Sequence, residues 1–301
     1  MFWQFVPFGS ASVIVFFVLS GYVISFVTTS KETSCRSYMV ARAGRIYSVA
    51  LPALLLTAVV DAMRRAWFPA APAWGDDLLA DFGWRLVASA LFLNEAWSAH
   101  VRAGSDIPYW SMSFEVAYYA LFGVATFSRG RHRWLGIGAI MLLAGPRIVA
   151  LLPCWLCGVA AHRLSSRELV ADHLRWPMFV VATAVLVGAV AAAGYPGLHA
   201  RTTDSFNHDV AGVVQDNLIG VALAAHLVGF NSVSQRFAWL LRGGRPIRAA
   251  AATTFGLYLY HMPILTFVAA WLGPLSLAIS IGLAQVTESR KGAWQRMMEA
   301  G

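Results

Sequence analysis

The chain has 301 residues, of which 58% are hydrophobic and 13% are charged. Soluble domains carry about 25% charged residues, so this composition excludes a water-soluble globule, a disordered chain, a coiled coil and a disulfide scaffold. The formal charge of +8 does not indicate nucleic-acid binding, because the basic residues stand in short clusters between long apolar runs. That pattern is typical of a protein inserted in a lipid bilayer.

Apolar runs approaching or reaching the roughly 20 residues of a spanning helix predict an all-α, polytopic transmembrane helix bundle. A run at Trp84–Trp97 is too short to cross, and we expect it to be re-entrant or to lie along the interface. About nine spans remain, in chain order Gly9–Thr29, Ile46–Val60, Tyr109–Phe127, Trp134–Ala150, Leu151–Ala161, Trp176–Ala193, Val210–Phe230, Ala250–Leu272 and Pro274–Val286.

The basic residues predict the orientation of the bundle. With these spans, 17 of the 23 Lys and Arg residues fall on one side, which predicts that this side is cytoplasmic. The protein is then a multi-pass protein of the cytoplasmic (inner) membrane with a cytoplasmic C-terminus, and the acidic segment 61–109 lies outside. Met1 also falls outside, which fits either an ordinary first helix with its N-terminus outside or an earlier helix that this chain lacks.

Polar side chains inside the third of these runs form the first candidate site. Glu115 lies in Tyr-Trp-Ser-Met-Ser-Phe-Glu-Val-Ala-Tyr-Tyr (109–119), and helical spacing places Ser111, Tyr118 and Tyr119 on its face. An ionisable group at bilayer depth costs about 2.5–3.5 kcal/mol, which favours a functional role. The alternative is a helix N-terminus, with Ser111 or Ser113 as the cap and Glu115 near the positive end of the helix dipole.

Two further motifs are weaker alone. His261 lies in an apolar stretch with Tyr258 one turn before it, where an imidazole takes up a proton, orients a partner or bonds a helix carbonyl. Arg42 and Arg45 share a helical face at the cytoplasmic end of the second span. Arg side chains suit phosphate or carboxylate ligands, and they equally suit the ordinary cytoplasmic excess of positive charge.

The remaining polar groups indicate structure rather than chemistry. Asp216, with its neighbours Gln215 and Asn217, is expected to hold helices together. Cys154 and Cys157 lie in an apolar run without a second pair, so we expect a structural role and no metal site.

Four segments, in this order and spacing, resemble the acyltransferase-3 family of integral-membrane acyltransferases. They are Val13–Ile24, Arg42-Ala-Gly-Arg45, Tyr-Trp-Ser-Met-Ser-Phe-Glu115 and Tyr-Leu-Tyr-His261-Met-Pro. The resemblance covers nearly the whole chain, so we expect one integral-membrane acyltransferase domain over residues 1–301. It implies that Glu115, His261 and Ser111 are catalytic and that Arg42 and Arg45 bind the donor.

The family also has an additional first helix, whose His is its expected catalytic base, and the complete family fold has ten helices. The first histidine here is His100, so this chain is expected to be N-terminally incomplete. Two alternatives to an active enzyme therefore stay open at this point. One is an inactive, truncated remnant of the acyltransferase, and the other is a transporter or flippase of an envelope intermediate.

The function implied by the resemblance is transfer of an acyl group, with acetyl expected, from a CoA donor to a hydroxyl of an envelope or secondary-metabolite acceptor. No cofactor is expected to be permanently bound, because acyl-CoA, expected to be acetyl-CoA, is a co-substrate. The expected partners are this donor, a carbohydrate or lipid-linked acceptor and the lipid bilayer. Arg42 and Arg45 would hold the CoA phosphates, while Glu115 and His261 would orient the base or the acceptor.

Overall fold

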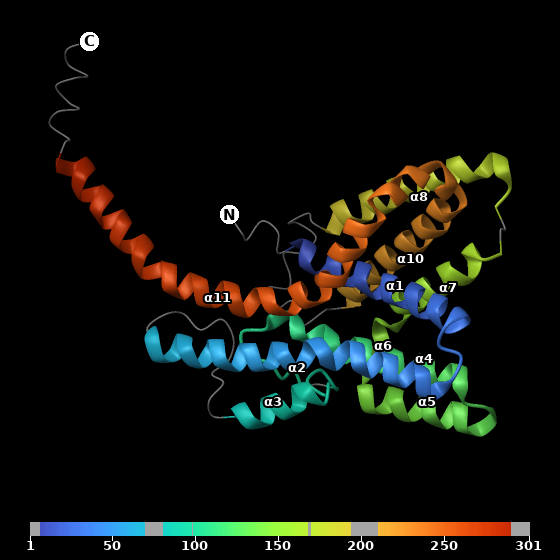
Figure 1. Ribbon diagram of the computed structural model, residues 1–301, viewed down its shortest axis with the longest axis horizontal. Coiled ribbons are helices and arrows are strands. Elements are labelled where there is room, and N and C mark those ends of the chain that lie inside the picture. The colour runs from blue at the N-terminus through green and yellow to red at the C-terminus, as the bar shows by residue number, and fades with distance from the viewer. Residues whose placement is uncertain (1–6, 70–80, 98, 168–169, 194–209, 290–301) are drawn as a thin grey trace, which may run out of the picture.

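The computed structural model describes residues 7–69, 81–97, 99–167, 170–193 and 210–289 (Figure 1). These residues form helices and contain no strand, which confirms the all-α class. The helices are α1 (Pro7–Ser30), α2 (Cys35–Trp67), α3 (Phe82–Ala90), η2 (Ile107–Tyr109), α4 (Trp110–Phe127), α5 (Gly130–Ala144), α6 (Pro146–Ala150), α7 (Leu152–Ser165), α8 (Asp172–Ala193), α10 (Val210–Val233), η3 (Ser234–Gly243) and α11 (Gly244–Ser289).

The helices form two groups in space. One group contains α1, α7, α8 and α10, which pack against one another, and the other contains α2, α4 and α5 with the short α3 at its edge (Figure 1). The long helix α11 packs along α2. Large side chains fill the space where α1, α4 and α7 meet, because Phe17, Phe114, Tyr118 and Trp155 are almost completely buried there.

Six described segments are long and apolar enough to cross a membrane. They confirm a polytopic membrane protein and lie at Ala11–Ser30, Cys35–Trp67, Pro146–Ser165, Asp172–Ala192, Gly212–Trp239 and Thr253–Leu272. The predicted span at Tyr109–Phe127 corresponds to the 18-residue helix α4, whose polar motif lowers its hydropathy. The expected run at Trp84–Trp97 contains only the nine-residue α3, about 14 Å long, which is too short to cross.

The structure divides two regions differently from the prediction. The crowded pair Trp134–Ala150 and Leu151–Ala161 forms α5, α6 and α7, because Gly145 with a φ of +84° ends α5 directly before Pro146. The predicted spans Ala250–Leu272 and Pro274–Val286 belong to one continuous helix, α11. The Gly273-Pro274 pair therefore does not separate two helices there.

Glycines allow α1 and α7 to pack at very short distance. A Cβ on Gly158 would lie 1.8 Å from the Val18 carbonyl oxygen, and a Cβ on Gly21 would lie 2.1 Å from the Trp155 carbonyl oxygen. Small residues at a helix contact are the usual means of close approach in membranes. This contact brings Ser20, the neighbour of Gly21, to the centre of the protein.

The segment after α3 packs on the ends of α4 and α5. Its backbone turns through positive φ angles at Phe92, Trp97 and His100, which is uncommon for residues other than glycine. Trp97 donates hydrogen bonds to the carbonyls of Leu142 (2.7 Å) and Ala144 (3.1 Å), so the segment is fixed against the end of α5.

Buried Glu95 fixes the same segment to α6. Its Oε2 accepts a hydrogen bond from Arg147 Nη1 at 2.5 Å and lies 3.3 Å from His100 Nδ1. Glu95 is 1% exposed, and its burial raises the pKa of its carboxyl, partly offset by the positive charge of Arg147.

Candidate active site

Glu115 lies at the centre of the protein, between the two helix groups. Its side chain is 1% exposed, and its Oε1 accepts hydrogen bonds from Ser20 Oγ at 3.1 Å and from the Tyr119 hydroxyl. Its Oε2 is buried and has no hydrogen-bond partner among the described residues. One carboxylate oxygen is therefore held in place, while the other remains able to accept a hydrogen bond from a bound molecule.

Three helices build the support around this carboxylate. Ser20 from α1 contacts both Glu115 and the Tyr119 hydroxyl (3.2 Å), and Trp155 from α7 donates its indole N–H to Ser20 Oγ at 3.3 Å. This network depends on the close glycine contact between α1 and α7. Ser20 and Trp155 were not among the predicted site residues, because nothing in their spacing along the chain relates them to Glu115.

Arg42 occupies one end of the network. Its Cζ lies 5.8 Å from the ring centroids of both Tyr38 and Tyr119, so it stands over two aromatic faces. Its guanidinium forms an ion pair with Glu32, and both side chains are nearly buried. Glu32 is a third site residue that could not be predicted from the sequence, since it follows the first span in a short polar turn.

Arg45 has a different environment. It is exposed, its Cζ lies 5.9 Å from the Phe255 ring centroid, and no carboxylate lies within ion-pair distance of it in the described part of the chain. It is nevertheless close enough to Glu115 and Tyr119 to interact with both electrostatically. Arg45 therefore lies between the buried carboxylate and the surface of the protein.

Ser111 does not cap α4. The helix begins at Trp110 without a side-chain cap and has no acidic residue in its first turn, so the capping alternative for Ser111 and Glu115 is wrong. Ser111 Oγ instead donates to the Pro108 carbonyl at 3.2 Å and accepts a hydrogen bond from the Tyr258 hydroxyl at 3.1 Å. This contact joins α4 to α11 one turn away from Glu115.

His261 has a defined tautomer. Its Nδ1 lies 2.8 Å from the Tyr258 carbonyl and 3.1 Å from the Leu257 carbonyl. A carbonyl only accepts hydrogen bonds, so Nδ1 carries the proton, and Nε2 of the neutral ring keeps a free lone pair. No hydrogen bond among the described residues joins His261 to Glu115 or Ser111, and its connection to them runs through Tyr258, whose ring centroid is 6.2 Å away.

The contacts place these groups at successive levels along α2. Arg45 faces Phe255, the Val49 carbonyl accepts from Tyr260 at 3.5 Å, and Trp67 faces Phe267, so α2 and α11 run in the same direction. His261 therefore lies near the middle of α2, with the two arginines toward the N-terminal end. The arrangement is a polar track that runs from Arg42 and Arg45 through Glu115 to Ser111, Tyr258 and His261.

Other polar groups of the apolar runs contact neighbouring helices. Asn217 of α10 donates to the Ala150 carbonyl at 3.2 Å and accepts from Cys154 Sγ at 3.4 Å, so it joins α10 to α6 and α7. His226 Nδ1 of α10 lies 3.0 Å from Thr183 Oγ1 of α8, so this contact joins α10 to α8. Cys154 and Cys157 are free thiols, and no group of three metal-ligating side chains occurs among the described residues.

Comparisons with known proteins agree with this arrangement. Residues 1–287 match the family model described as an acyltransferase domain of the acyltransferase-3 type. A segment covering 38% of the chain is 31% identical over 117 residues to acyltransferase MdmB of Streptomyces mycarofaciens, and it spans 27% of that protein's length. No solved structure matches the chain.

The family match decides between the enzyme and the transporter in favour of the enzyme, since the family is one of transferases. It also covers the polar track from end to end, because Arg42, Glu115 and His261 all lie within residues 1–287. The chain therefore belongs to the acyltransferase-3 family, and its described helices are those of a multi-pass membrane protein.

Proposed function

We propose that the protein transfers an acetyl group from acetyl-CoA to a hydroxyl group of a carbohydrate or lipid-linked acceptor in the cytoplasmic membrane. The observation that carries this proposal is the polar track. Arg45 is exposed and has no carboxylate partner among the described residues, and one oxygen of the buried Glu115 lacks a hydrogen-bond partner there. His261 lies farther along the track, with its Nδ1 held by a main-chain carbonyl.

The arginine end of the track suits the donor. CoA carries several phosphate groups, and guanidinium groups bind phosphate through charge-assisted, often bidentate hydrogen bonds. Arg45 is exposed and available for such a contact. Arg42 is held by Glu32, so a phosphate must displace the Glu32 carboxylate before it contacts Arg42 with full strength. Glu32 thereby keeps the buried Arg42 charge paired while no donor is bound.

The reaction is attack of the acceptor hydroxyl on the thioester carbonyl. The oxygen of the acceptor forms the new ester bond, the carbon–sulfur bond breaks, and the thiol group of CoA leaves. The hydroxyl loses its proton as it attacks, and the leaving sulfur takes up a proton. An imidazole is the side chain best matched to both transfers near neutral pH.

His261 Nε2 is the proton acceptor that this chain provides at the middle of the track. The two main-chain carbonyls that bind Nδ1 fix the ring orientation, so Nε2 is the nitrogen through which the ring can act as a general base. Tyr258 and Ser111 lie beside it and offer hydroxyl groups to the acceptor or to the thioester oxygen. Glu115 acts as a positioning group, because its fixed Oε1 leaves Oε2 free to orient the acceptor hydroxyl.

The test is transfer of label from [14C]acetyl-CoA to products other than CoA, in membranes that hold the protein and its native lipids and glycans. The native chain is expected to transfer label, and Glu115→Gln is expected to lower the rate at least about a hundredfold, as the loss of one positioned polar group does. Thr126→Val changes an exposed residue of the same helix and is the matched control. Unchanged transfer by Glu115→Gln, or none by the native chain, would overturn the proposal.

A further inference from the structure

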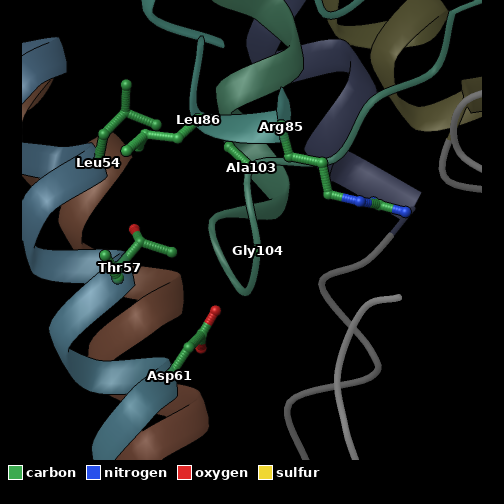
Figure 2. Close-up of a pocket in the computed structure, with 8 residues that line it drawn as sticks. Leu54, Thr57, Asp61, Arg85, Leu86, Ala103 and Gly104 are labelled. Atoms are coloured by element: carbon green, nitrogen blue, oxygen red, sulfur yellow. The ribbon is translucent and has the colours of Figure 1, made fainter. Parts of the chain in front are cut away.

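A pocket lies at the Asp61 end of α2, at the opposite end of this helix from the two arginines (Figure 2). It is bounded by α2, α3 and the turn after Val101, and its space is about 250 Å³, including solvent at the open side. We call it the Asp61 pocket. Its apolar residues are Leu54 and Ala58 from α2, Leu86 from α3 and Ala103 from the turn, and Arg85 of α3 also lines it.

Asp61 is the carboxylate of this wall. Its side chain is 5% exposed and points from α2 toward the turn that carries Gly104 (Figure 2). Oδ2 accepts a hydrogen bond from the Ser105 main-chain N–H at 3.0 Å, whereas Oδ1 is buried without a partner among the described residues. A buried carboxylate oxygen without a hydrogen bond is costly, and such a group at a pocket wall indicates a ligand that completes it.

A second carboxyl group, Asp106, follows in the same turn. It is 1% exposed, and neither of its oxygens has a hydrogen-bond partner in the described part of the chain. Burial, together with the nearby negative charge of Asp61, raises the pKa of Asp106 well above its ordinary value. A second carboxyl group buried beside Asp61 disfavours two negative charges at this place, whereas a divalent cation site needs both.

The Asp61 pocket adjoins the end of the polar track. Asp106 is close enough to Tyr258 to interact with it electrostatically, and the Tyr258 hydroxyl binds the Pro108 carbonyl at 3.2 Å and Ser111 at 3.1 Å. Asp61 follows Arg42 by 19 residues on one helix, which is a rise of about 28 Å, close to the thickness of the hydrocarbon core. The pocket and the arginines thus lie near opposite faces of the membrane.

We propose that the Asp61 pocket binds the acceptor, a neutral hydroxyl-bearing molecule of carbohydrate type, and that Asp61 Oδ1 accepts a hydrogen bond from one of its hydroxyl groups. This inference rests on the proposed function and assigns its acceptor site. An apolar wall with one fixed hydrogen-bond acceptor suits a sugar ring, whose C–H faces are apolar and whose hydroxyl edge donates. The enclosed part of this space is far smaller than a ligand pocket of about 300 Å³, so it takes a single hydroxyl group of an acceptor whose remainder lies outside the pocket.

The test is binding of a simple glycoside to the protein in lipid nanodiscs, read as a shift of the thermal unfolding temperature. A thiol-reactive dye reports unfolding through buried Cys154, after replacement of the exposed Cys35 and the half-buried Cys157 by Ser. The probes are methyl α-D-glucopyranoside and its 2-amino-2-deoxy analogue. The glucoside is expected to stabilise the native chain. Thr57→Val is the matched control, because Val has the shape of Thr and the Thr57 hydroxyl donates to the Ala53 carbonyl rather than to a ligand, so this variant should be stabilised equally.

Asp61→Asn is expected to weaken glucoside binding about tenfold or more. The Asn amide oxygen must face the Ser105 N–H, so its NH₂ group presents a donor where the ligand needs an acceptor. Leu86→Phe fills the pocket from α3 and is expected to abolish the shift without touching either carboxylate. Acetyl-CoA binding, measured on the same variants, should be unchanged and shows that they are folded.

Stabilisation of the native chain and Thr57→Val, but not of Asp61→Asn or Leu86→Phe, supports the acceptor site. Absence of glucoside binding to the native chain, equal binding by Asp61→Asn, or binding of the amino analogue alone overturns it. If acetyl-CoA binding persists, these outcomes exclude the acceptor site but do not contradict the proposed function, because the donor contacts lie at the other end of α2.

Discussion

Gly158→Ala is predicted to disable the site from a distance. A Cβ on Gly158 would lie 1.8 Å from the Val18 carbonyl oxygen and 2.7 Å from the Tyr22 nitrogen, and both are main-chain atoms of α1 that cannot rotate away. Ordinary contact begins near 3.4 Å, so α1 and α7 must separate by about 1.6 Å. Ser20 lies on the displaced helix, and its 3.1 Å bond to Glu115 then lengthens beyond hydrogen-bond range.

The expected cost of this overpacking is about 1–3 kcal/mol of stability. Loss of the hydrogen bond from Ser20 leaves Tyr119 as the remaining hydrogen-bond donor to Glu115 among the described residues. We therefore expect the rate of acetyl transfer to fall at least about tenfold. Both effects are measurable, the first by dye-monitored thermal unfolding in nanodiscs and the second by transfer from labelled acetyl-CoA.

Gly188→Ala is the matched control. Gly188 lies within α8, and a Cβ there meets nothing within 4 Å, so the change should leave activity unaltered and stabilise the helix slightly. If Gly158→Ala behaves like Gly188→Ala in both measurements, the α1–α7 contact does not position Glu115, and the reasoning is refuted.

Three further predictions follow from buried charges. Glu32→Gln removes the competitor for Arg42, so acetyl-CoA should bind several-fold more tightly in a filter-binding assay, and equal or weaker binding would exclude the displacement step. Asp106→Asn should raise the unfolding temperature at pH 7 and leave it unchanged near pH 4. Burial raises the pKa of Asp106 in the folded protein, so above about pH 4 the unfolded chain releases this proton while the folded protein keeps it. The free energy of unfolding therefore falls as the pH rises, and Asn removes this loss. An equal gain at both pH values would show that proton linkage is not the cause. Arg147→Met leaves the buried Glu95 without its cation and should cost about 3 kcal/mol of stability, most of which the double variant with Glu95→Gln should restore; failure of that rescue would contradict the pairing.

Much of the architecture follows from the sequence because membrane-spanning helices are long apolar runs, which hydropathy identifies directly. The bundle class, the failure of the region around α3 to cross and the grouping of Glu115 with its own helix neighbours needed only hydropathy and helical periodicity. The number of helices was harder to predict. Gly273-Pro274 reads as a break, yet α11 runs through it from Gly244 to Ser289.

The partners of the site residues could not be predicted, since they come from other helices. Ser20 reaches Glu115 across 95 positions of sequence, and Tyr258 reaches Ser111 across 147. Both contacts depend on how helices cross, which is set by packing at glycines such as Gly21 and Gly158. Glu32 is close to Arg42 in the sequence, but its role could not be predicted, because a charged residue in a polar turn usually faces solvent. Here the chain folds back after α1 and pairs Glu32 with Arg42.

The central claim is that the arginine end of the polar track holds a CoA donor, and equilibrium binding of [14C]acetyl-CoA to the purified protein tests it most directly. Arg45→Ala is expected to weaken binding about tenfold or more, as loss of a charge-assisted phosphate contact does. Arg175→Ala removes a half-buried arginine that pairs with Asp172 at 2.8 Å, and it should bind like the native chain. Equal affinity of Arg45→Ala and Arg175→Ala would contradict the account.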